Sequence, residues 1–213
     1  MTAPISKEKL HKVVCCIDAD ILKIEENVQN SLLSPQLSPF DGKKCSALIA
    51  LHEKLLGRYS DYLLAVQHPS GPTDQRTLAT TLKLPGRIWR YGLCGLIQLL
   101  KRQLPDSLDH FIHFLHISYS MMCLLYENVP MFREIWMECL GDLARTRSML
   151  PDLNAWERHC WRKIAQSWFK RVADENPEVG CICTSALQIL IGCRQDAYST
   201  IKDVSQNMDR SLN

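Results

Sequence analysis

The sequence has no long apolar run, no strong net charge and no run of alternating apolar and polar residues. Apolar runs such as 121–126 are far shorter than the roughly 20 residues that a membrane-spanning helix needs. The charged N-terminus contains no apolar core of a signal peptide. The net charge is +2, too small for a polybasic nucleic-acid binder, so a phosphate site would have to come from local clustering. The missing alternation argues against β-strands.

Catalytic signatures are also missing. The sequence contains no phosphate-binding glycine loop, no Gly-x-Ser-x-Gly elbow and no His-Glu-x-x-His motif, and its acidic residues are scattered over expected helix exteriors. We therefore expect a protein that is not an enzyme and has no cofactor.

Metal-binding patterns are weak. The spacing of Cys181, Cys183 and Cys193 is not that of a zinc site, which places two or more residues between paired cysteines. The ten cysteines are expected to act as small buried apolar residues in a reducing compartment, the nucleus or the cytoplasm. Three histidines follow one another at a spacing of three: His110, His113 and His116. The nearest acid, Asp109, is expected to point elsewhere, so these histidines are predicted to lie in the core or at its boundary.

Helical periodicity is what the sequence does contain. Apolar residues recur every three or four positions over residues 5–33, 43–67, 75–84, 87–103, 108–128, 136–150 and 154–174, with short turns between. This predicts an all-α fold of antiparallel neighbouring helices, as a helical bundle or an α-solenoid. The expected organisation is a long N-terminal helix (1–33), a linker (34–42), a helical domain (43–196) and a polar, disordered tail (197–213).

The most informative stretch is Trp-Met-Glu-Cys-Leu-Gly-Asp-Leu-Ala-Arg-Thr-Arg at 136–147. One apolar stripe is formed by Trp136, Leu140, Leu143 and Ala144. Gly141 lies within this pattern and is expected to let another backbone come close. Arg145 lies near the stripe, where it can reach into a groove between helices. The alternative is that Arg145 only pairs with Asp142, three residues earlier.

Three motifs resemble the Est/SMG family of telomerase-associated and nonsense-mediated-decay proteins. They are Leu-Gly-Asp-Leu-Ala-Arg at 140–145, Pro-Gly-Arg-Ile-Trp-Arg at 85–90 and Trp-Phe-Lys-Arg-Val-Ala at 168–173. The resemblance covers about residues 51–180 and is closest to a fungal group with an Est-type DNA/RNA-binding domain. The signature tyrosine of the family is Thr146 here. The resemblance implies a 14-3-3-like (TPR-like) helical-repeat domain, shortened at its C-terminus relative to the family.

The resemblance also implies a phosphate site. Arg90 takes the place of the family's phosphate-binding lysine, and Arg145 is the signature arginine. Ile97 stands where 14-3-3 proteins carry a second arginine, so the full basic triad is absent and a lower affinity is expected. If the resemblance holds, the guanidinium groups of Arg90 and Arg145 should lie within about 10 Å of each other, inside one Debye length. The alternative for Arg90 is a solvated helix exterior, and Arg147 is expected to be a neutral control.

Basic residues are concentrated after residue 145. A possible nucleic-acid or acidic-partner face comprises Arg158, Arg162, Lys163, Lys170 and Arg171. With Trp161 nearby, this face could attract a phosphate backbone, or it could be an ordinary solvated helix face. The leading interpretation is a noncatalytic adaptor that binds a phosphorylated decay or telomere factor. The alternatives are direct binding of DNA or RNA, and a degenerate helical scaffold.

Overall fold

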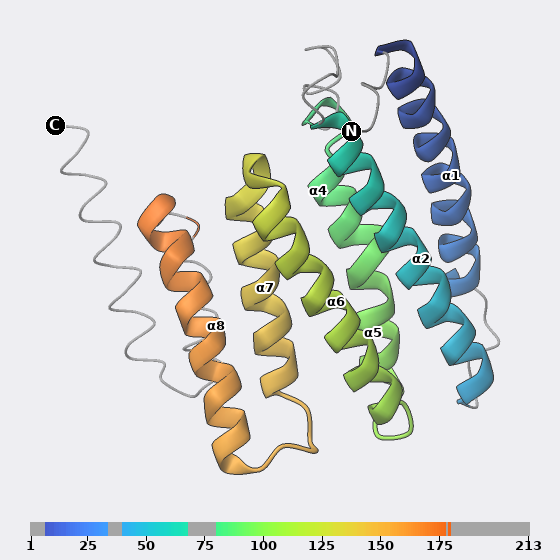
Figure 1. Cartoon of the computed structure of the whole chain (residues 1–213). Helices are drawn as coiled ribbons and strands as arrows, with labels where there is room; N and C mark the ends of the chain where they lie inside the picture. The colour runs from blue at the N-terminus through green and yellow to red at the C-terminus, as the bar shows by residue number, and fades with distance from the viewer. Residues whose placement is uncertain (1–6, 34–39, 68–79, 178, 180–213) are drawn as a thin grey trace, which may run out of the picture. The chain divides into compact units, whose positions relative to one another are not determined.

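A computed structural model describes residues 7–33, 40–67, 80–177 and 179 (Figure 1). These residues contain helices and no strand, which confirms the predicted all-α class. The elements are α1 (Lys7–Leu33), α2 (Gly42–Val66), α4 (Leu84–Arg87), the π-helix η1 (Ile88–Cys94), α5 (Gly95–Arg102), α6 (Leu108–Asn128), the 3-10 helix η2 (Pro130–Phe132), α7 (Arg133–Ser148) and α8 (Ala155–Glu175). No helix of the described residues is long and apolar enough to cross a membrane.

Contacts divide the chain into two units, Met1–Met131 and Phe132–Asn213. The division falls inside the predicted domain of residues 43–196. The predicted tail, most of the predicted linker and most of the predicted short helix at 75–84 lie outside the described residues, as do the three C-terminal cysteines.

In the first unit, α1 packs against α2, and α2 packs against both η1 and α6 (Figure 1). Fully buried side chains from all these elements form its core: Ile21, Val28, Leu55, Tyr59, Tyr62, Leu63, Ile88, Leu93, Phe111 and Phe114. Ser46 of α2 contacts His110 of α6. His52, later in α2, contacts Phe114, later in α6. Because the paired positions advance in the same direction on both helices, α2 and α6 run parallel.

The prediction of a single α-helix at 87–103 is wrong in one respect, because the first part of this segment is π-helical. The segment divides into α4, η1 and α5, and η1 covers seven residues. A π turn needs one more residue than an α turn, is rare and is often found at functional sites. Hydrophobic periodicity cannot reveal it, because the apolar residues on both sides of the π turn remain buried.

The second unit contains a hairpin of α7 and α8. The predicted stripe on α7 is buried, with Trp136, Leu140 and Ala144 at 0% exposure. Asn154 caps α8: its side chain accepts from the Glu157 N–H at 2.9 Å, and the Glu157 carboxylate accepts from the Asn154 N–H at 3.0 Å. This reciprocal pair satisfies two backbone donors that a helix start otherwise leaves free.

Gly141 is a contact point between α7 and α8, but the prediction that it admits a backbone is wrong. A Cβ built at Gly141 would lie 2.3 Å from Cε1 and 2.6 Å from Cδ1 of Phe169. Phe169 is 1% exposed and therefore has little room to move. The glycine thus makes space for an aromatic ring of α8.

The cysteines are less uniformly buried than predicted. Cys45 and Cys139 are buried, and burial raises the pKa of both thiols. Cys15 and Cys16 on α1 are exposed. The expectation of small buried apolar residues is therefore wrong for this pair.

Candidate functional site

Arg90 lies in the middle of the π-helix η1 and is exposed. On either side of it, Trp89 and Tyr91 are half-buried, while Ile88 and Gly92 are buried. No hydrogen bond or ion pair joins the Arg90 guanidinium to another described residue. The five N–H donors of Arg90 are thus available to an external acceptor.

Arg87, three residues earlier, was not singled out from the sequence, although it belongs to the same motif. It binds Glu25 of α1 with two hydrogen bonds, Nε to Oε1 at 3.0 Å and Nη2 to Oε2 at 2.9 Å. Its Nη1 lies 3.9 Å from Asp18 Oδ1, and the Tyr59 hydroxyl donates to Glu25. Arg87 therefore ties α1 to the remainder of the first unit.

The acids of this cluster did leave a signal in the sequence. The inward face of α1 contains Val14, Asp18, Ile21, Glu25 and Val28 at spacings of four and three. Two carboxylates on an apolar stripe require a buried cation as a partner, because an unpaired buried charge is costly. This pattern could have predicted the cluster, but not which basic residue completes it.

The cluster has strong internal electrostatics. Burial by itself would lower the pKa of Arg87, but the hydrogen bonds and charge of Glu25 outweigh it and raise that pKa overall. Burial and Glu25 together raise the pKa of the Tyr59 hydroxyl. Burial, with Asp18 nearby, raises the pKa of Tyr62 to about 12. The guanidinium of Arg87 is thus committed to internal carboxylates and is not a free phosphate ligand.

Arg145 pairs with Asp142 at 2.6 Å, which is the alternative that its spacing allowed. Both side chains are half-buried, at 27% and 34% exposure. Burial raises the pKa of Asp142, although Arg145 opposes the shift. Glu134 and Glu138 precede Asp142 on the same face of α7. Burial raises the pKa of Glu138, and the charges of Glu134 and Asp142 raise it further. Arg145 therefore ends an acidic stripe, and an approaching anion must compete with Asp142.

Arg147 is not the neutral control that its position outside the stripe suggested. Its guanidinium binds Asp152 with two hydrogen bonds, at 2.8 and 2.7 Å, and its side chain is 11% exposed. A substitution of Arg147 would disturb the turn between α7 and α8, because Asp152 lies in that turn.

Arg90 belongs to the first unit and Arg145 to the second. Each residue is described within its own unit, so the expected approach of their guanidinium groups stays a prediction.

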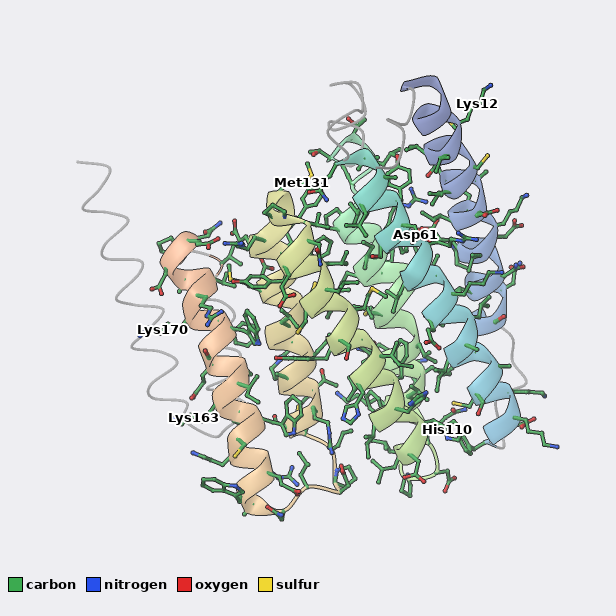
Figure 2. All side chains as sticks on the ribbon, viewed as in Figure 1. Lys12, Asp61, His110, Met131, Lys163 and Lys170 are labelled. Atoms are coloured by element: carbon green, nitrogen blue, oxygen red, sulfur yellow. The ribbon has the colours of Figure 1, made fainter. Side chains whose placement is uncertain are left out.

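The basic residues of α8 divide into two groups. Arg158 donates to the carbonyls of Ser148 and Leu153, both at 3.2 Å, and so satisfies acceptors at the end of α7 and in the turn. Arg162 is half-buried, whereas Lys163, Lys170 and Arg171 are exposed. Lys163 and Lys170 lie along α8 (Figure 2). Only the second group can form an open basic surface.

Aromatic rings accompany these cations. The Arg171 guanidinium lies 5.0 Å from the ring centre of Trp168, a cation–π contact. Trp156 is 73% exposed and stacks on His159, with ring centroids 6.3 Å apart. An exposed aromatic ring of this kind can stack on a nucleic-acid base.

The first unit has a pocket of about 320 Å³ between α2 and α6, lined by Ser46, Ile49, Ala50, Glu53, Asp109, His110 and His113. His110 lies at the beginning of α6, and its Nε2 is 3.2 Å from Ser46 Oγ (Figure 2). The expectation that Asp109 points away from the histidines is wrong, because it lines the same pocket as His110 and His113. His110 is half-buried, at the boundary of the core as predicted, whereas His113 and His116 are exposed, so the prediction is wrong for these two. The residues in the described ranges contain no group of ligands suited to a metal ion.

Comparison with known proteins gives no relative for this chain: no family model, no curated protein and no solved structure matches it.

Proposed function

We propose that the protein is a noncatalytic adaptor that binds a phosphorylated protein partner and, through its resemblance to the Est/SMG family, acts in RNA decay or telomere maintenance. The observation that carries this proposal is the exposed Arg90 on a π-helical turn. Arginine binds phosphate well because its planar fork can donate two parallel hydrogen bonds to phosphate oxygens.

The surroundings of Arg90 support a fixed site. The π turn that contains Arg90 contacts α2, because His52 donates to Gly92 and Leu56 packs on the same glycine. A basic residue on a backbone turn that is fixed by packing loses less conformational entropy on binding than one on a mobile surface helix. The internal carboxylates of the first unit are already paired with Arg87, which leaves Arg90 for an external anion.

Replacing Arg90 with glutamate is expected to weaken the binding of phosphoserine peptides about tenfold to a hundredfold. Hydrogen bonds to charged groups contribute roughly 1.5–3 kcal/mol, which corresponds to this range. Calorimetric titration of phosphorylated and unphosphorylated peptides from decay or telomere factors measures the change.

The matched control is Arg102→Glu, because Arg102 is also an exposed arginine of the first unit and lies at the end of α5. It should bind within about twofold of the wild type, since only long-range and screened charge is altered there. Equal losses in the two variants would mean that general charge, and not a site at Arg90, attracts the peptide.

A double-mutant cycle of Arg90→Gln and Arg145→Gln tests whether both arginines hold one phosphate. Residues that share a ligand group couple by about 0.5–3 kcal/mol, whereas independent sites add within about 0.3–0.5 kcal/mol. Additivity would remove Arg145 from the site and leave it as the partner of Asp142.

A second candidate function, binding of single-stranded nucleic acid, is favoured by the exposed ring of Trp156 and by the cations of α8. Bases stack on such rings while lysine and arginine neutralise the backbone. A third possibility, a helical scaffold with neither ligand, remains if both binding tests fail.

Direct nucleic-acid binding is expected to weaken with salt, with a slope of about −0.7 in log K against log salt for each neutralised phosphate. Replacing Lys163, Lys170 and Arg171 together with glutamine should flatten this slope by about two units. Arg158 is omitted because its guanidinium donates hydrogen bonds to backbone carbonyls at the end of α7 and in the turn that follows. Fluorescence anisotropy with a labelled oligonucleotide measures the slope, and no binding at low salt would eliminate this candidate.

A further inference from the structure

We infer that His52 is a positioning residue for Arg90: together with Leu56 it clamps Gly92 and thereby sets the direction in which the π-helical turn presents the arginine. The part of this inference that concerns phosphate rests on the proposed function. The part that concerns the clamp rests on geometry within the first unit and can be tested without a ligand.

His52 is fully buried at 0% exposure, and its Nδ1 lies 2.9 Å from the carbonyl oxygen of Gly92. A carbonyl can only accept, so the proton of this hydrogen bond belongs to Nδ1. Burial lowers the pKa of His52, and the bond to Gly92 opposes the shift only in part, so the ring is neutral. The imidazole is thus a fixed donor that points at the π-helix.

The same ring is held from the other side. Phe114 of α6 meets His52 edge to face, with centroids 5.6 Å apart and an interplanar angle of 77°. Aromatic pairs at this distance and angle are favourable. Since His52 and Phe114 are both fully buried, packing restricts the rotation of the imidazole away from Gly92.

Leu56 supplies the second half of the clamp. It follows His52 by four residues, so both side chains lie on one face of α2. A Cβ built at Gly92 would come within 2.8 Å of Leu56 Cδ2, and Leu56 is fully buried. A side chain at Gly92 would therefore force Leu56 to shift, and α2 holds the glycine by one hydrogen bond and one close apolar contact.

Arg90 precedes Gly92 by two residues within the same π-helix. If the segment relaxed from π to α geometry, the helical register would shift by one residue. Side chains before the shift would then be rotated by about 100° relative to those after it. The contacts at Gly92 oppose this relaxation. The direction of Arg90 thus depends on a contact that Arg90 itself does not make.

The test uses His52→Phe, which keeps an aromatic ring but removes the donor, and His52→Asn, whose amide N–H can take the place of Nδ1–H. Hydrogen exchange of the backbone amides at 88–98 is expected to accelerate in His52→Phe and to remain slow in His52→Asn. Phosphoserine-peptide affinity should fall about tenfold in the phenylalanine variant, since misplacing a binding group by about 1 Å is costly. The asparagine variant should bind within about twofold of the wild type.

His116→Phe is the control, because His116 is an exposed histidine of the same unit. If His52→Phe does not fold, Gly92→Ala disturbs the clamp from the Leu56 side and is measured in the same way. Unchanged exchange at 88–98 would overturn the clamp. Faster exchange with unchanged affinity would overturn the positioning role. If the wild type binds no phosphopeptide, the proposed function fails, and the clamp is still decided by hydrogen exchange.

Discussion

Replacing Arg87 with alanine is expected to lower the free energy of unfolding of the first unit by about 3–5 kcal/mol. The substitution leaves Glu25, whose side chain is 7% exposed, as a buried carboxylate without its cation. The hydroxyl of Tyr59 remains as a donor to Glu25 but cannot neutralise its charge. Urea denaturation followed by circular dichroism measures the change as a lower midpoint at an unchanged slope.

Arg58 of α2 offers a matched control, because it also forms an ion pair with an acid of α1 but does so at the surface. It lies 3.8 Å from Asp20 and 3.3 Å from Asp61, and its side chain is 39% exposed. Arg58→Ala should cost less than about 1 kcal/mol. The double variant Glu25→Met with Arg87→Met should recover part of the loss, because it removes both buried charges. Equal costs for Arg87→Ala and Arg58→Ala would show that water reaches the Arg87 cluster.

Gly141→Ala is expected to destabilise the hairpin of α7 and α8 by about 1–3 kcal/mol, a typical cost of overpacking. Alanine is the better helix former by roughly 1 kcal/mol, so the expected loss runs against intrinsic propensity. The cause is the Phe169 ring, three of whose carbons would lie within 2.8 Å of the new methyl group. Thermal unfolding followed by circular dichroism measures the change.

Gly57→Ala is the control for propensity, because a Cβ at Gly57 of α2 meets nothing within 4 Å. This variant should gain about 0.5–1 kcal/mol. Phe169→Leu makes room at Gly141, so the double variant should lose less stability than the sum of the single variants. A Gly141→Ala variant as stable as the wild type would mean that Phe169 can rotate away.

Much of the fold could be predicted from the sequence, because it depends on local periodicity and capping. The helix predicted at 108–128 has the same bounds as α6, and the cap at Asn154 follows from its side-chain chemistry alone. The pair of Arg145 and Asp142 was likewise open to prediction, since a spacing of three brings side chains together on any helix.

Other features depend on contacts between distant residues, and no local pattern encodes them. Arg87 and Glu25 are 62 residues apart, and His52 and Gly92 are 40 apart. The sequence indicated that Gly141 must be small, but the ring that fills the space comes from another helix. For the site, the motif drew attention to Arg90, while the residue that holds its turn, His52, lies in a helix with no recognisable motif.

The turn between α7 and α8 also bears on the order in which the chain can fold. Its contacts are short in sequence: Arg147 binds Asp152, and Arg158 reaches back only ten residues to Ser148. Bringing such close positions together costs less loop-closure entropy than joining Arg87 to Glu25. Structures rich in short-range contacts also form faster. The hairpin follows the first unit during synthesis, yet its turn closes with less help from distant residues than the pair of Arg87 and Glu25.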